Sequence, residues 1–194
     1  MEKEILEYGR LTNEQKSEAV DLFLEVFGHF MTFSKDETGK KNLFTEIFDP
    51  ELFMCYLEED KVLGLMGLGT NMKRPIDFKV EICRKYFGKI RGTLISKQMN
   101  TIFQKPAVSS ERELYLDTLV TDPGCRKKGI GTALINAACS FGDYDSVIVE
   151  VFSDNENAIG FYEKNSFVRI KENKSSVMRL LGSGYPIVME KKKI

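Results

Sequence analysis

Apolar positions in the first fifty residues predict one strand and two helices. Residues 5–11 have the character of a short strand, and Thr12 with Gln15 forms the capping-box pattern that begins many helices. Residues 41–48 predict a second helix, which should end before Pro50 because proline disfavours the helical conformation in the preceding residue. The first helix should bury one face, since its apolar residues recur three and four positions apart: Ala19, Leu22, Phe23, Val26, Phe27 and Phe30.

The middle of the chain predicts a hairpin followed by a helical segment. Two apolar runs, residues 52–57 and 62–68, are separated by four charged residues, a pattern typical of an antiparallel hairpin. Apolar residues then recur at helical spacing from Phe87 to Phe103 and predict one long amphipathic helix. Gly88 and Gly92 oppose this prediction because glycine weakens a helix.

From residue 114 onward, strand and helix patterns alternate. This order, preceded by a hairpin, favours a mixed α/β sheet with helices joining neighbouring strands. We find no internal repeat or linker, so residues 1–194 are expected to form a single domain. The expected strands are residues 114–121, 147–152, 167–170 and 185–189, and the expected helices are residues 132–141 and 158–164.

Composition excludes several classes of protein. The chain has 194 residues, of which 42% are hydrophobic, and no apolar stretch approaches the ~18 residues of a membrane span. Its first residues lack the pattern of a secretory signal, so we expect a soluble cytoplasmic protein without a membrane partner. The four cysteines form no C-x-x-C pair and the chain has 1 histidine, so no metal site is predicted.

Charge is unevenly distributed along the chain. Residues 1–70 carry 7 basic and 15 acidic side chains, whereas residues 71–105 carry 9 basic and 2 acidic ones. The basic segment favours an anionic neighbour such as a nucleotide cofactor, although a solvated helix face would have the same pattern. Nucleic acid is the less favoured partner, and the same segment could form a homodimer contact. The acidic segment favours a cationic acceptor.

A glycine-rich loop between a strand and a helix, residues 122–132, is suited to binding phosphate. A helix N-terminus presents unpaired N–H groups and partial positive charge, and glycine lets the backbone close around an anion. A Walker A loop requires lysine after its second glycine, but Ile130 follows Gly129. A dinucleotide fingerprint requires a third small residue, but that position holds Leu134.

The remaining pattern, R-x-x-G-x-G at Arg126, Gly129 and Gly131, resembles the acetyl-CoA loop of the GNAT acetyltransferase superfamily. Residues 155–167 resemble the family's N-x-x-A-x-x-F-Y-x-x-x-G-F segment, with Ser166 in place of the usual glycine. The resemblance implies a GNAT-like acyl-CoA N-acyltransferase fold with a helical insert between the hairpin and the fourth strand. It also implies an acetyl-CoA-dependent enzyme that acetylates a primary amine of a small molecule or peptide by direct attack.

The resemblance further implies where acetyl-CoA would bind. In the family, two parallel strands part and the pantetheine arm lies in the gap, so residues 114–121 and 147–152 should part here. The pantetheine amides would then pair with main chain of the first strand, and the pyrophosphate would rest on the glycine-rich loop. The implied cofactor-binding residues are Leu119, Val120, Thr121, Arg126, Lys127, Lys128, Gly129, Ile130, Gly131, Thr132, Asn155, Ala158 and Tyr162.

Three residues are candidates for catalysis. Tyr162 would protonate the departing thiolate, or would be a core aromatic residue. Asp117 is expected on the strand face of Tyr115 and Leu119, beside the thioester, as a base or a substrate anchor, and Glu113 is the second candidate. Because fold alone does not fix function, the alternative is an acyl-CoA-binding regulatory module without turnover. The acceptor site is expected between the first two helices and the hairpin, where six phenylalanines would supply aromatic walls, although aromatic residues at helical spacing more often belong to the core. They are Phe27, Phe30, Phe33, Phe44, Phe48 and Phe53.

Overall fold

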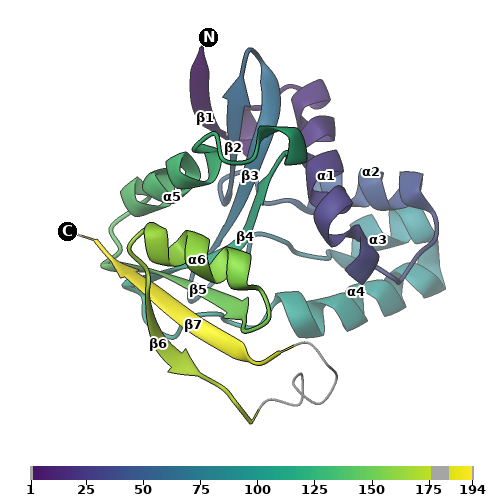
Figure 1. The fold of residues 1–194 in the computed structure, drawn as a ribbon. Helices are drawn as coiled ribbons and strands as arrows, with labels where there is room; N and C mark the ends of the chain where they lie inside the picture. The colour runs from purple at the N-terminus through teal and green to yellow at the C-terminus, as the bar shows by residue number, and fades with distance from the viewer. Residues whose placement is uncertain (1, 176–183, 194) are drawn as a thin grey trace.

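The computed structural model describes residues 2–175 and 184–193. Within these ranges the chain forms a seven-stranded mixed sheet in the order β1-β2-β3-β4-β5-β7-β6 (Figure 1). The strands are β1 (Lys3–Glu7), β2 (Phe53–Glu58), β3 (Lys61–Gly69), β4 (Glu113–Thr121), β5 (Ser146–Phe152), β6 (Val168–Glu172) and β7 (Pro186–Lys192). The helices are α1 (Asn13–Phe27), α2 (Glu37–Ile47), α3 (Val80–Phe87), α4 (Lys89–Phe103), α5 (Ile130–Ser140) and α6 (Glu156–Lys164).

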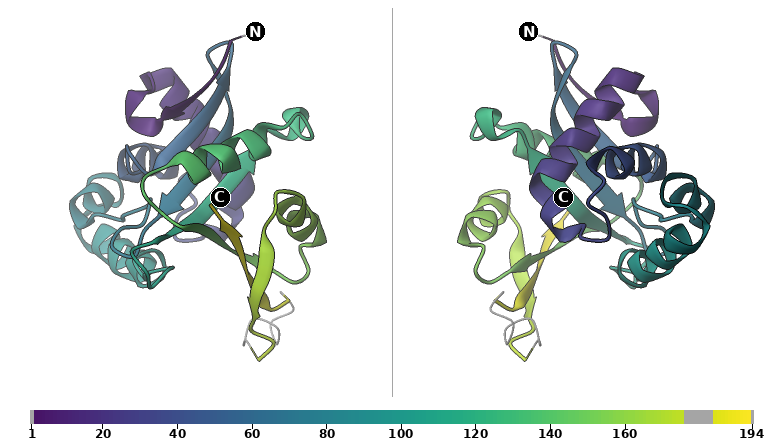
Figure 2. Two further views of the ribbon diagram at one scale, coloured as in Figure 1. Left: turned by 90° about the vertical axis from the view of Figure 1, so that its left-hand side faces the viewer. Right: turned by 90° about the vertical axis from the view of Figure 1, so that its right-hand side faces the viewer.

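Helices cover both faces of the sheet, and each face has its own hydrophobic core. The first core joins the sheet to α1, α2, α3 and α4, and the second joins it to α5 and α6 (Figure 2). The first contains Phe44 and Phe53, and the second contains Leu134 and Val147. This arrangement confirms the predicted mixed α/β sheet. No helix in the described ranges is both long and apolar enough to cross a bilayer.

The start of α1 confirms the predicted capping box. The Gln15 amide N–H donates to the Thr12 hydroxyl at 3.2 Å, and the Thr12 N–H donates to the Gln15 side chain at 3.0 Å. The strand before it is shorter than predicted, because β1 ends at Glu7 and a 3₁₀ turn follows. Helix α2 begins earlier than predicted, because the Asp36 side chain caps it by accepting from the Gly39 amide.

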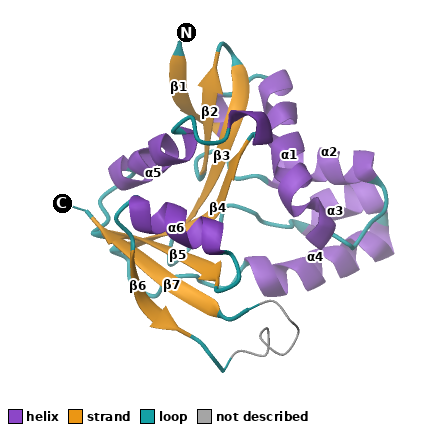
Figure 3. Cartoon of the chain, in the orientation of Figure 1, coloured by secondary structure: helices purple, strands orange, loops and turns teal. Residues whose placement is uncertain are grey.

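The insert between β3 and β4 is helical, as predicted, but it contains two helices and not one (Figure 3). Gly88 ends α3 and begins α4 with a φ of +78°, a conformation that residues with a Cβ adopt rarely. Gly92 lets the two helices approach, since a Cβ there would lie 2.4 Å from the Cys83 carbonyl oxygen. Three residues of the predicted apolar face are exposed: Ile90, Leu94 and Ile102.

The predicted hairpin is formed by β2 and β3. Its turn residues Glu59 and Asp60 both have positive φ, at 52° and 63°, which is the geometry of a tight two-residue hairpin turn. Strand β3 then pairs with β4, so the hairpin leads directly into the centre of the sheet. The centre of the sheet is therefore antiparallel up to β4, and the parallel pairing begins only between β4 and β5.

Candidate active site

Strands β4 and β5 are paired at one end only. The parallel register joins Glu113–Tyr115 to Ser146–Ile148 and then stops, although β4 continues to Thr121 and β5 to Phe152. This parting of the two strands confirms the predicted gap. It leaves the β5-facing edge of β4 without a neighbouring strand over Leu119–Thr121, the segment predicted to pair with pantetheine.

A β-bulge in β4 lies where the strands part. Gly67 of β3 faces Thr118 and Leu68 faces Leu116, so Asp117 has no partner on β3. Before the bulge, Leu116 faces the core with α5 and α6. After it, Leu119 packs against that same core. The prediction that Asp117 and Leu119 lie on the same face of the strand is therefore wrong, because the extra residue in the bulge reverses the alternation of side chains. Asp117 and Tyr115 do lie on the same face, where both side chains contact Arg74.

The glycine-rich loop ends at the N-terminus of α5. Gly129 is the N-cap with φ +84°, and a Cβ at this position would meet nothing within 4 Å. In the described part of the chain, the amides of Ile130, Gly131 and Thr132 have no protein acceptor, as expected for the first turn of a helix. Open space in front of free N–H groups and a positive helix end fits a pyrophosphate.

Basic side chains surround this helix end. Arg126, Lys127 and Lys128 are all exposed, and Lys127 has a φ of 62°, which turns the chain towards the helix. Gly131 packs against α6, since a Cβ there would lie 2.9 Å from the Phe161 ring. The loop therefore has a cationic rim and a close contact with the helix that carries Tyr162.

Helix α6 is held at both ends by side-chain and backbone bonds. The Asn155 side chain caps its start by accepting from the Ala158 amide at 3.1 Å. At its end, the Phe167 amide donates to the Tyr162 carbonyl and the Ser166 amide donates to Glu163, which is a Schellman motif. Ser166 occupies the glycine position of this motif with a φ of 67°.

The Tyr162 side chain is buried between two aromatic rings. Phe161 and Phe167 contact it edge-on, with ring centroids 5.3 Å and 5.2 Å away. Only 6% of the residue is exposed, and burial raises the pKa of its hydroxyl. No described residue accepts a hydrogen bond from this hydroxyl. It is therefore a protonated donor that is free for a ligand.

The Asp117 carboxylate is paired with Arg74, a residue that the sequence analysis did not select. Arg74 Nε donates to Asp117 Oδ2 at 2.8 Å, and Arg74 Nη2 lies 2.8 Å from the same oxygen in an ion pair. Burial raises the pKa of Asp117, and the guanidinium of Arg74 acts in the opposite direction. Arg74 also lies over the Tyr115 ring, 5.2 Å from its centroid.

Tyr115 and Glu150 are two more ionisable residues near the place where β4 and β5 part. Burial raises the pKa of Tyr115, and the charges of Asp117 and Glu150 raise it further, while Arg74 lowers it. Glu150 lies on β5 beyond the last pair with β4, and its side chain is exposed. Glu113 lies at the opposite, paired end of β4, opposite Ser146. Glu150 could have been found from sequence as the single charge within an apolar strand, but Arg74 has no local signal.

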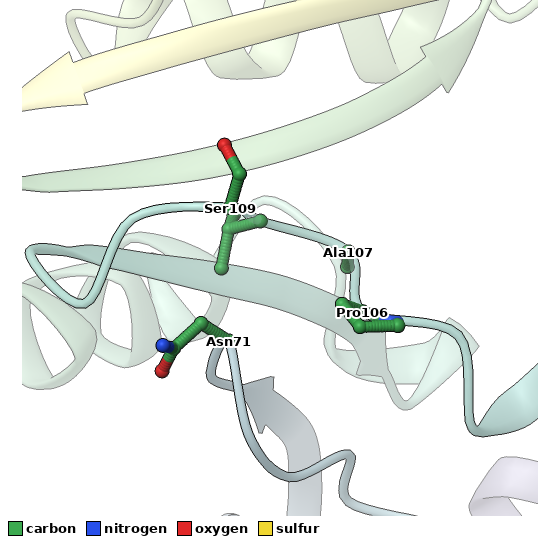
Figure 4. A pocket seen from close by; sticks show the side chains of 5 residues that line it. Asn71, Pro106, Ala107 and Ser109 are labelled. Carbon is green, nitrogen blue, oxygen red and sulfur yellow. The ribbon is translucent and has the colours of Figure 1, made fainter.

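A hollow of about 470 Å³ lies beside the Arg74 loop and is lined by Asn71 and by residues 106–109 (Figure 4).

The predicted aromatic pocket is wrong for Phe44, Phe48 and Phe53, which are 0–4% exposed and belong to the core. Phe27 and Phe33 are partly buried against that core, and Phe30 is exposed. No cluster of His, Cys, Asp and Glu within residues 2–175 and 184–193 could hold a metal ion.

Solved structures share this fold at low sequence identity. An N-acetyltransferase from Staphylococcus aureus Mu50 has a TM-score of 0.64 at 13% identity, over 97% of this chain and 100% of that one. A GNAT-family acetyltransferase from Bacillus cereus has a TM-score of 0.60 at 14% identity, over 100% and 99% of the two chains. Ard1 from Thermoplasma volcanium has a TM-score of 0.58 at 17% identity, over 100% and 99%.

Sequence comparison gives the family. N-alpha-acetyltransferase 50 of Danio rerio is 32% identical over 75 residues, which are 37% of this chain and 45% of that protein. The chain thus matches less than half the length of this curated relative. The profile of the acetyltransferase (GNAT) family matches residues 18–167, well over half of the chain. The chain therefore belongs to the GNAT acetyltransferase family.

Proposed function

We propose that this chain transfers the acetyl group of acetyl-CoA to a primary amine by direct attack. The observation that supports this most is the parting of β4 from β5 after Tyr115, next to the free amides at the start of α5. Residues 126–132 would hold the pyrophosphate, with Lys127 and Lys128 at its charged rim. Main chain of Leu119, Val120 and Thr121 would pair with the pantetheine amides, as a strand would. Asn155 and Ala158 would line the start of α6 beside them.

Tyr162 is proposed as the proton donor to the leaving thiolate. Only 6% of the residue is exposed, its raised pKa keeps the hydroxyl protonated, and no described residue accepts a hydrogen bond from it, which suits a donor. A thiolate expelled into the same apolar surroundings would also hold a proton more tightly than in water, because burial disfavours its charge. Burial therefore raises the proton affinity of the thiolate as well as that of Tyr162, which favours transfer of the proton between them.

The amine must lose a proton before it attacks. At pH 7 this costs about 4.6 kcal/mol for a lysine-like amine but only about 1 kcal/mol for an α-amine, whose pKa is near 8. Asp117, Glu113 and Glu150 are the candidate carboxylates. Glu150 is the one that is exposed and lies beyond the last β4–β5 pair, so we favour it as base through solvent. Asp117 is paired with Arg74, and Glu113 lies at the closed end of the gap.

The acceptor we favour is the α-amine of a peptide. The zebrafish relative is named as an N-alpha-acetyltransferase, and an α-amine places the smallest demand on a base that is open to solvent. A lysine side chain or a small polyamine would need a stronger base than an exposed carboxylate. The free energy of deprotonating the amine is therefore the basis both for the proposed substrate class and for the choice of Glu150 as base.

The test is release of free thiol from acetyl-CoA with a matched set of acceptors. The set contains one peptide with a free N-terminus, the same peptide with its N-terminus blocked and a lysine added, and a polyamine. We expect thiol release to require the free N-terminus. Acetyl transfer to the lysine peptide or to the polyamine alone would contradict the proposal that the acceptor is an α-amine. Coenzyme A binding by calorimetry with no thiol release for any acceptor would contradict turnover and support a regulatory binding module.

A further inference from the structure

The strongest unassigned feature is the side chain of Arg74, which joins three separate segments. It lies in the loop after β3 and binds Asp117 in β4 through Nε and Nη2 at 2.8 Å. Its Nη1 donates to the Lys105 carbonyl at 2.6 Å, just after α4. Arg74 therefore connects both ends of the helical insert to one residue of β4.

Stability alone does not explain this ion pair. The side chains of Arg74 and Asp117 are only 13% and 12% exposed. Removing two charges from water costs about as much as their attraction returns, so a buried pair of this kind contributes little net stability. The planar guanidinium group instead holds its partners in fixed positions, because its N–H donors point in fixed directions.

The pair acts at the point where the strands part. Asp117 is the bulge residue of β4, and Tyr115, two residues earlier, makes the last β4–β5 pair. Arg74 also covers the ring of Tyr115. The position of the bulge decides which main-chain groups of Leu119–Thr121 face the gap, since a shift of one residue would reverse them.

We propose that Arg74 is a positioning residue that, through Asp117, fixes the bulge of β4 and hence the groups lining the gap, a role that rests on the proposed acetyl transfer. Asp117 then contributes to turnover by holding β4 and not by taking a proton. Taking a proton would remove the negative charge that pairs with Arg74, whereas no ion pair is found for Glu150 in the described part of the chain.

The test compares Arg74→Met, Asp117→Asn and the double variant with the intact enzyme. We expect each single change to lower kcat about 10- to 100-fold, because misplacing reacting groups by about 1 Å has this effect. KM for acetyl-CoA should also rise, by about two- to tenfold, because the displaced main chain of Leu119–Thr121 pairs with pantetheine while the α5 loop is untouched. The double variant should lose no more than either single one, because both changes break the same contact.

Matched variants separate this role from general damage. Arg112 also binds a carboxylate, Asp145, with Nε at 2.9 Å, but it is exposed and precedes β4, so Arg112→Met should keep kcat within about twofold. Arg74→Lys retains the charge without the fork and should fall between wild type and Arg74→Met. It also keeps the test valid if Arg74→Met does not fold, which thermal melting would reveal.

Two kinetic outcomes would overturn the proposal. One is an Arg74→Met or Arg74→Lys enzyme with wild-type kcat. The other is an Asp117→Asn enzyme that loses the acidic limb of its pH profile while Arg74→Met keeps most of its kcat, which would make Asp117 the base. Hydrogen exchange of residues 113–121 provides a readout without turnover and should rise in Arg74→Met. If wild type acetylates no amine, the proposed function fails, whereas unchanged exchange contradicts the role of Arg74.

Discussion

At the scale of single residues, the site depends on how Tyr162 is held. Its carbonyl accepts from the Phe167 amide, and its ring contacts the Phe167 ring at 5.2 Å. Both contacts require the chain to turn at Ser166 in a left-handed conformation. The family's usual glycine would take this conformation without steric cost, so Ser166 is a strained residue that supports the proposed acid.

We expect Ser166→Gly to stabilise the protein by about 0.5–1 kcal/mol. A left-handed conformation costs a residue with a Cβ roughly 1–2 kcal/mol, and the greater freedom of glycine in the unfolded chain offsets part of that gain. Thermal melting should show a rise of about 1–4 °C. The control is Ser109→Gly, at an exposed loop residue without positive φ, which should leave stability unchanged or lower it. Equal changes in melting temperature for the two variants would contradict the backbone strain at Ser166.

Tyr162→Phe should lower kcat about 100-fold or more and leave KM for acetyl-CoA unchanged. The change removes only a hydroxyl that no described residue binds, so the fold should be intact. Because burial raises the pKa of Tyr162, the wild-type hydroxyl stays protonated to about pH 9 and should cause no loss of rate on the basic side. Tyr144→Phe, at a partly buried ring stacked on Phe141, is the control. A wild-type rate in Tyr162→Phe would end the acid role.

At the scale of elements, the sequence was informative wherever local chemistry decides the structure. The capping box at Thr12, the glycine at the start of α5 and the cap at Asn155 all lie within four residues of what they stabilise. The insert was harder, because its apolar spacing continues through Gly88 although the chain turns there. The role of Gly92 depends on its contact with the backbone of Cys83 in the neighbouring helix. The sequence around Gly92 does not indicate that contact, so it could not show whether this glycine weakens a helix or allows two helices to pack.

Two helical glycines should respond in opposite ways to alanine. Gly92→Ala should destabilise the protein by about 1–3 kcal/mol, because the new Cβ would meet backbone of Cys83 at 2.4 Å and force α3 and α4 apart. Gly160→Ala in α6 should stabilise it by about 0.5–1 kcal/mol, since nothing lies within 4 Å and alanine favours the helix. Denaturant midpoints measure both changes. The same sign at both positions would contradict the α3–α4 contact.

At the scale of the whole molecule, the sheet is divided where acetyl-CoA is proposed to bind. Strands β1 to β4 form one part, β5 to β7 the other, and three residue pairs join them. The loop and α6 motifs could be recognised in sequence because their chemistry is local. Arg74 could not, since 43 residues separate it from Asp117 and the bulge that brings them together has no sequence signature.

Because the proposed ligand would fill the gap between the two parts, coenzyme A should stabilise the whole fold. A ligand at 100 times its dissociation constant adds about 2.7 kcal/mol, which for a chain of this size raises the melting temperature by about 5–10 °C. Pantetheine, which lacks the pyrophosphate, should give a smaller shift. Gly129→Asp should abolish the shift for coenzyme A, because a carboxylate would occupy the open space before the α5 amides and repel phosphate. Equal shifts for both ligands, or a full shift in Gly129→Asp, would show that α5 does not bind the diphosphate.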